Sequence, residues 1–146
     1  MRQPVKKNMI DVSLWSPRLL AALRMVTALL FIEHATMKFL EFPAYIPNTP
    51  HPLPPLEAVA GIIELVAGPL ILVGLFTRIA AFIASGEMAV AYFLVHIKLS
   101  VWPTLNHGEP AIAFCFIFLY LSAAGAGSWS LDGARGLRDS RTEKFA

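Results

Sequence analysis

The stretch LLAALRMVTALLFIEHATMKFL, residues Leu19–Leu40, is long and apolar enough to form a helix that crosses a bilayer. A transmembrane helix needs about 20 such residues. The stretch nevertheless contains four charged or titratable side chains: Arg24, Glu33, His34 and Lys38. A charge near the centre of a membrane helix costs roughly 3 kcal/mol on insertion scales. These side chains are therefore expected to face other parts of the protein rather than lipid.

Three further apolar stretches follow, at Leu56–Phe76, Ile79–Leu99 and Pro110–Ala126. The hydrophobic fraction of the chain is 56%, the charged fraction is 15%, and the mean hydropathy is +0.60. These values are more hydrophobic and less charged than the average of soluble proteins, and they are typical of membrane proteins. The sequence therefore predicts an all-α, integral membrane four-helix bundle.

The second and third stretches each contain one glutamate in their interior, Glu64 and Glu87, as the first contains Glu33. Acidic residues inside membrane helices face the interior of a bundle and mark functional pathways more often than other residues do. With a rise of about 1.5 Å per residue, Glu33 and Glu64 lie roughly 10–12 Å below the outer ends of their helices. Most other polar side chains lie above them, which predicts a polar cavity that opens outward.

The positive charges predict the orientation of the bundle. With four spans and both termini on one side, ten of the twelve Lys and Arg residues lie on that side: Arg2, Lys6, Lys7, Arg18, Arg24, Arg78, Arg135, Arg138, Arg141 and Lys144. Cytoplasmic loops are enriched in these residues, so an N-in, C-in protein of the inner (plasma) membrane with several passes is expected. The basic ends are explained by the lipid bilayer as partner, and no nucleic-acid partner is required.

This orientation divides the chain into three parts. Residues 1–17 are expected to form a cytoplasmic lead that ends where Pro17 begins the first helix. Residues 18–130 form the four-span domain, and residues 131–146 form a basic cytoplasmic tail that partly lacks regular structure. The proline-rich segment Glu41–Pro55 is expected to be an extended loop, and Gly74–Arg78 a tight hairpin between two antiparallel helices.

The candidate site residues are the polar residues near and above the buried glutamates. The catalytic candidates are Glu33, Glu87 and His96, and the ligand-binding candidates are His34, Lys38, Glu64, Asn106 and Glu109. By helical phase His34 and Lys38 stack one turn apart, Glu87 and Lys98 are nearly in phase, and Glu33 points more than a quarter-turn away from Lys38. Phase alone does not place all the acids in one pocket.

Three interpretations of these residues remain open. Ion pairs between Glu and Lys, Arg or His hold the helices in register, or the residues line a substrate or quinone pocket in which a glutamate or histidine moves protons. A metal or haem site is the third, but the histidine spacing matches no ligand motif and no metal is predicted. The lone cysteine, Cys115, is interpreted as a small packing residue.

Several segments resemble the DoxX family of membrane proteins. They are the segment from Arg24 through Phe31–Phe39 to Phe42-Pro43, then Leu72–Arg78, Gly86–Phe93 with His96, Trp102-Pro103 with Asn106–Glu109, and Gly125–Asp132. The family is similar to the small membrane subunit of a thiosulfate:quinone oxidoreductase. The resemblance thus implies a quinone-linked redox subunit, or a membrane partner of such a complex, with quinone as the cofactor. A non-catalytic membrane scaffold or chaperone is the alternative, and a homo-oligomer is left open.

Overall fold

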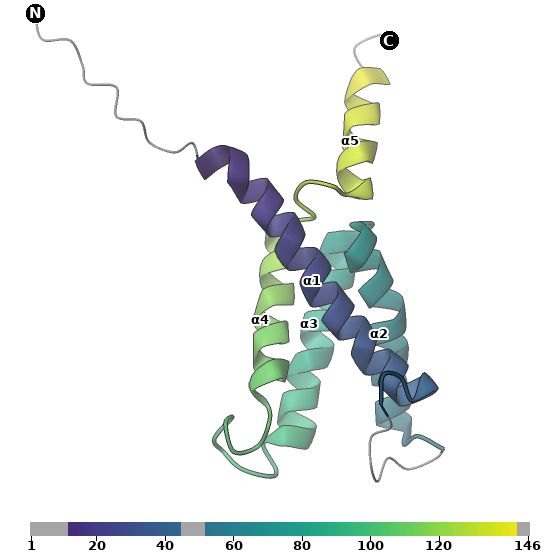
Figure 1. The fold of residues 1–146 in the computed structure, drawn as a ribbon, viewed down its shortest axis with the longest axis vertical. Helices are drawn as coiled ribbons and strands as arrows, with labels where there is room; N and C mark the ends of the chain where they lie inside the picture. Colours follow the sequence, from purple (N-terminus) through teal and green to yellow (C-terminus); the bar gives the residue numbers. More distant parts are fainter. Residues whose placement is uncertain (1–11, 45–51, 143–146) are drawn as a thin grey trace, which may run out of the picture.

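The computed structural model describes residues 12–44 and 52–142, and the regular secondary structure of this part of the chain is all helical, without strands (Figure 1). The helices are α1 (Val12–Leu40), α2 (Pro55–Val73), α3 (Thr77–Ala91), the π-helical turn η1 (Tyr92–His96), α4 (Glu109–Ala124) and α5 (Leu131–Thr142). The all-α prediction is therefore confirmed.

Three helices are long and apolar enough to cross a membrane: Ser13–Leu40 in α1, Pro55–Val73 in α2, and Thr77–His96 in α3 and η1. The fourth expected span forms α4, an apolar helix of 16 residues. At about 1.5 Å per residue this helix is about 24 Å long, which is shorter than the roughly 30 Å hydrocarbon core. The described residues therefore form a membrane-type bundle in which α4 is the short member.

The long helices pack in pairs, and small side chains lie where they approach each other. The most extensive contacts join α3 to α4 and α1 to α2, and α2 also packs on α3, while α1 runs diagonally across the bundle (Figure 1). On α2, Gly61 and Gly68 lie directly under Phe39 and Ile32 of α1. Small residues let helix backbones approach closely in membrane bundles. This face of α2 therefore determines how closely α1 can cross.

Aromatic side chains fill the space between α1 and α4. The ring of Phe31 lies 4.8 Å from that of Phe118 and 6.2 Å from that of Phe114, centroid to centroid. Both spacings are typical of favourable aromatic pairs. On the neighbouring face of α4, the hydroxyl of Ser85 donates a hydrogen bond to the carbonyl oxygen of Cys115 at 2.9 Å. Helix α4 thus packs on α1 through large rings, and on α3 it meets a face of mostly small buried residues.

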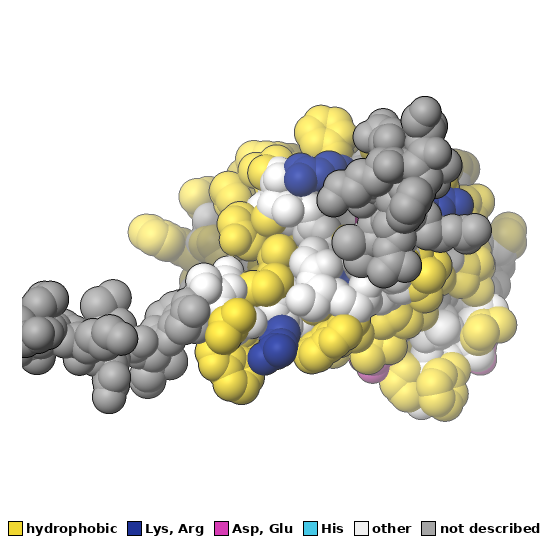
Figure 2. All heavy atoms as spheres, turned by 90° about the horizontal axis from the view of Figure 1, so that it is seen from above, with side chains coloured by type: hydrophobic (Ala, Val, Ile, Leu, Met, Phe, Trp, Pro, Cys, Tyr) yellow, Lys and Arg dark blue, Asp and Glu magenta, His cyan; other side chains and the backbone are white. Residues whose placement is uncertain are grey.

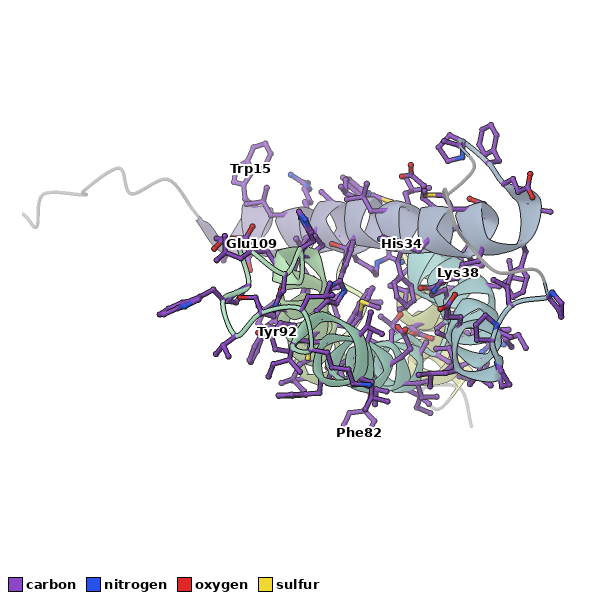
Figure 3. All side chains as sticks on the ribbon, turned by 90° about the horizontal axis from the view of Figure 1, so that it is seen from below. Trp15, His34, Lys38, Phe82, Tyr92 and Glu109 are labelled. Atoms are coloured by element: carbon purple, nitrogen blue, oxygen red, sulfur yellow. The ribbon has the colours of Figure 1, made fainter. Side chains whose placement is uncertain are left out.

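The outer surface of the bundle is apolar. Many large hydrophobic side chains are exposed, among them Phe82 and Phe116 at 65% each, and Phe82 points away from the bundle in Figure 3. Apolar patches of this extent are unusual on soluble monomers. Contact with lipid explains this exposed surface, because an apolar side chain is unfavourable in water but not among hydrocarbon tails.

The bundle has two different ends. The loop end carries the connections after α1 and after η1, and the terminal end carries the α2–α3 turn and α5 (Figure 1). Figure 2 looks onto the terminal end, where Lys and Arg side chains lie among the hydrophobic ones. The α2–α3 turn is as tight as predicted, since Gly74 ends α2 with a φ of 70° and α3 begins at Thr77.

Three sequence-based predictions about helix ends were wrong. The first helix begins at Val12, so Pro17 lies inside it, where its carbonyl oxygen accepts a hydrogen bond from the backbone N–H of Ser128 at 3.0 Å. The tail forms α5 instead of lacking regular structure over residues 131–142. The third helix ends at His96, so Lys98 lies in the following turn and does not share a helical face with Glu87. In all three places, contacts outside the local sequence or a change of helix type shifted the boundary.

Candidate functional site

An ion pair between α1 and α2 forms the centre of the candidate site. The Nζ atom of Lys38 lies 2.7 Å from Oε1 of Glu64, and the side chain of Glu64 is only 2% exposed. Glu64 lies on the same face of α2 as Gly61 and Gly68, the face on which α1 packs. Removing either partner of such a pair leaves an uncompensated charge in an environment of low dielectric constant. The pair therefore ties α1 to α2 at a defined height.

A second carboxylate lies close to this pair on a third helix. Glu87 of α3 is half-buried and interacts electrostatically with both Glu64 and Lys38. Among the described residues, neither Oε2 of Glu64 nor Oε2 of Glu87 has a hydrogen-bond partner. The cluster of Lys38, Glu64 and Glu87, here called the triad, thus contains two carboxylates and one ammonium. It has unused acceptor capacity inside the bundle.

His34 lies one helical turn before Lys38 on α1. Figure 3 shows both side chains pointing from α1 toward the other helices, whereas Trp15 points away from them. The His34 ring meets the ring of Phe114 edge-on, with 5.8 Å between centroids. His34 is exposed and Lys38 is 19% exposed, so this side of the triad is open to the surface of the bundle.

Glu33 does not join the triad. Its side chain is exposed and lines a separate groove of about 390 Å³. The groove lies on the outer side of α1 and is also lined by Leu29, Ile32, Thr36, Phe42 and Pro43. This placement agrees with the expectation from helical phase that Glu33 and Lys38 face different neighbours.

His96 and Asn106 lie together at the loop end, where they hold the connection between η1 and α4. Nδ1 of His96 is 2.9 Å from the carbonyl oxygen of Asn106. The side chain of Asn106 is fully buried, donates to the carbonyl of Ser100 at 2.7 Å and accepts from the N–H of Gly108 at 2.7 Å. Both ends of the Asn106 amide are therefore used within the connection. Glu109 is exposed in the first turn of α4.

Arg24 has a position that its spacing along the chain did not indicate. It is completely buried at the terminal end, and one of its terminal nitrogens donates to the carbonyls of Ile71 and Leu72 at 2.8 and 2.9 Å. The other terminal nitrogen donates to the carbonyl of Trp129 at 2.9 Å. The last carbonyls of a helix have no intrahelical partner, and a cation is favourable there. Arg24 therefore caps α2 and ties the segment before α5 to it.

Arg78 and Asp132 complete this network. The guanidinium of Arg78 donates to the carbonyls of Ser122 and Ala123 at the end of α4. The carboxylate of Asp132 accepts hydrogen bonds from the N–H groups of Phe76 and Thr77, at 2.8 and 2.9 Å, and so caps α3. Burial alone would raise the pKa of Asp132, but these backbone hydrogen bonds hold it below its usual value. A cavity of about 460 Å³ lies beside the network, lined by Arg78 and Asp132 among others.

The structure thus divides the predicted site residues into groups. Lys38, Glu64 and Glu87 come together and His34 lies nearby, whereas Glu33, Glu109 and the pair of His96 and Asn106 lie elsewhere. Within residues 12–44 and 52–142, no three His, Cys, Asp or Glu side chains are grouped closely enough to hold a metal ion. The triad therefore offers hydrogen-bond acceptors, one ammonium group and exchangeable protons.

Comparison with known proteins agrees with this architecture. The sequence profile of the DoxX family matches residues 19–97, which is more than half of the chain. The chain belongs to the DoxX family. This DoxX protein is also 44% identical over 128 residues to a protein of Haemophilus influenzae described as uncharacterized, covering 85% of the chain and 96% of that relative. No solved structure matches it significantly. Family membership and the apolar helices together make it a membrane protein.

Proposed function

We propose that this DoxX protein is a membrane subunit, or a membrane partner, of a quinone-linked oxidoreductase. In this proposal it lies in the bacterial inner membrane with both termini in the cytoplasm, and the triad opens toward the outside. The observation that carries the proposal is the triad itself, because two carboxylates and one ammonium inside an apolar bundle form a site for exchanging protons. The family resemblance to a quinone-reducing complex gives the substrate class.

The chemistry assigned to the triad is limited to protons. Reduction of a quinone takes two electrons and two protons, and a partner protein would supply the electrons. Glu87 has no ion-pair partner as close as that of Glu64, so it is the carboxylate best suited to gain and lose a proton. Lys38 and Glu64 hold the geometry, and His34 lies where the site reaches the bundle surface. In this proposal Glu33 and His96, which lie apart from the triad, have at most secondary roles.

A non-catalytic scaffold is the second candidate function. It is favoured by one specific observation, namely that the Lys38–Glu64 pair joins α1 to α2. Pairs of this kind fix helix register without any ligand. In a scaffold, the apolar outer surface would bind partner proteins and the triad would only maintain the fold.

Thermal unfolding in mild detergent with increasing decylubiquinone distinguishes the two functions. A ligand that binds only the folded bundle raises the melting temperature as its concentration rises. We expect a rise of several degrees for the wild type. The rise should be largely lost in Glu87→Gln, which leaves the Lys38–Glu64 pair in place.

Phe116→Leu is the matched control, because Phe116 is 65% exposed on the outer surface, and it should keep the rise. Mass spectrometry of the purified protein should also detect a co-purifying quinone. If neither decylubiquinone nor decylubiquinol changes the wild-type melting curve and no quinone co-purifies, the scaffold function replaces the redox one.

A further inference from the structure

The hydrogen-bonding capacity of the triad is unequal between donors and acceptors. Oε1 of Glu64 accepts from Lys38, whereas Oε2 of Glu64 and Oε2 of Glu87 have no partner among the described residues. Glu64 is almost completely buried, so its free oxygen lies inside the bundle. An ionised carboxylate can only accept hydrogen bonds. The unused positions of the site are therefore mainly acceptors, together with the remaining N–H groups of Lys38.

A ligand that fits these positions must offer hydrogen-bond donors. A buried acceptor without a partner is costly, and a hydrogen bond to a charged group is stronger than a neutral one. The hydroxyl of a quinol can donate to a carboxylate oxygen and accept from the ammonium of Lys38. While both carboxylates are ionised, a quinone carbonyl can only accept from Lys38, and it would leave both Oε2 atoms without partners.

An aromatic cluster lies next to His34, which is one helical turn from Lys38. The rings of Phe31, Phe114 and Phe118 pack against one another between α1 and α4, and His34 lies edge-on to Phe114 at 5.8 Å. Aromatic side chains favour stacked or edge-on contacts with a planar ring. His34 and Lys38 are both accessible from the bundle surface, so a ligand dissolved in the lipid has a route to the site.

We infer that the triad binds the reduced quinol in preference to the oxidised quinone. This inference rests on the proposed function and specifies which redox form the site recognises. It concerns binding alone, so no electron transfer is assigned to these residues. In a membrane that contains both forms, the bundle would hold quinol and release quinone.

Paired titrations with decylubiquinol and decylubiquinone, carried out without oxygen at one pH, test the preference. From the melting temperature as a function of concentration, we expect the wild type to bind the quinol at least about tenfold more tightly. Glu87→Gln replaces an acceptor oxygen by an amide that also donates. This change removes an acceptor that the quinol needs, so it should weaken quinol binding more than quinone binding and reduce the ratio toward one.

Phe116→Leu should keep the wild-type ratio, because Phe116 lies on the outer surface. Equal binding of the two forms, or tighter binding of the quinone, by the wild type would overturn the inference and leave the proposed function in place. An unchanged ratio in a folded Glu87→Gln protein would also overturn it. If neither form shifts the melting curve, both the inference and the proposed function fail.

Discussion

At the scale of single residues, Arg24 makes more structural contacts than any feature of the sequence suggested. A buried guanidinium can bridge three carbonyls because its donors are arranged in a rigid, planar fork. Here the three acceptors belong to Ile71, Leu72 and Trp129, and Asp132 lies near enough to interact electrostatically. A lysine in the same place would keep the charge but lose the fork.

Arg24→Lys should therefore destabilise the bundle by on the order of 2–4 kcal/mol, since at least one buried carbonyl loses its donor. The free energy of unfolding, measured with denaturant in detergent, reports this directly. Arg18→Lys is the control, because Arg18 is exposed on the same helix and a change there should stay within about 0.5 kcal/mol. Equal stability of the two variants would contradict the role given to Arg24.

Residue types in the candidate site were predictable, but their partners were not. The sequence shows Lys38, Glu64 and Glu87 as polar residues in apolar stretches, and insertion energetics requires such groups to find partners. Which partner each one finds depends on the angle at which α1 crosses α2. Lys38 and Glu64 are 26 residues apart in the chain, and no periodicity within one helix relates them. The outward position of Glu33, by contrast, follows from its helical phase relative to Lys38, which the sequence does show.

At the scale of helices, the glycines of α2 set the distance between α1 and α2. A Cβ atom added at Gly68 would lie 2.5 Å from Cγ1 of Ile32, well inside van der Waals contact. In α3, by contrast, a Cβ atom at Gly86 would meet nothing within 4 Å. The two glycines therefore form a matched pair for testing the role of close packing.

Gly68→Ala should lower the free energy of unfolding by about 1–3 kcal/mol, because the added methyl group pushes α1 away from α2. Gly86→Ala should leave stability unchanged or raise it by up to about 1 kcal/mol, since alanine favours the helix and has open space. Thermal unfolding of both variants in the same detergent makes the comparison. If the Gly68→Ala protein were as stable as the Gly86→Ala protein, α1 and α2 would not need to approach each other so closely.

Helix boundaries were less predictable than the presence of the helices. Pro17 suggested a helix start, but the helix continues back to Val12. Pro17 contacts Gly127 and Ser128, on the segment that follows α4, and the sequence around Pro17 does not indicate these contacts. The π-helical turn η1 likewise depends on a wide hydrogen bond from the N–H of Ile97 to the carbonyl of Tyr92 at 3.0 Å. A wide turn of this kind changes the phase of every later residue.

At the scale of the whole molecule, the N-in, C-in orientation remains a prediction. It rests on ten Lys and Arg residues on one side against two on the other, and the described part of the chain begins and ends at the same end of the bundle (Figure 1). Activity reporters fused after Leu53 and after Asn106 should therefore be active only outside the cytoplasm. A reporter at the C-terminus should be active only in the cytoplasm, and serves as the internal control. Cytoplasmic activity of the Leu53 fusion would refute the orientation and the outward-facing triad.

The overall architecture was largely predictable because it depends on bulk properties. Four apolar stretches, a proline-rich connection and the glycine at position 74 define the helices and their order, whichever side chains meet inside. The network of Arg24, Arg78 and Asp132 was not predictable, although all three residues lie in segments quoted for the family resemblance. Its hydrogen bonds run from side chains to backbone carbonyls and N–H groups, which carry no residue-specific signal in the sequence.

The hydrogen bond from Arg24 to the carbonyl of Trp129 also has a consequence for folding during synthesis of the chain. Trp129 follows Arg24 by 105 residues, so the first helix receives its last acceptor only after all four apolar helices have been synthesised. Until then, one guanidinium nitrogen has to be satisfied by water or lipid headgroups. A nascent chain that is released before this point has its helices but cannot close the terminal end. The segment that follows α4 thus fixes the position of α1 only after the helices between them have been made.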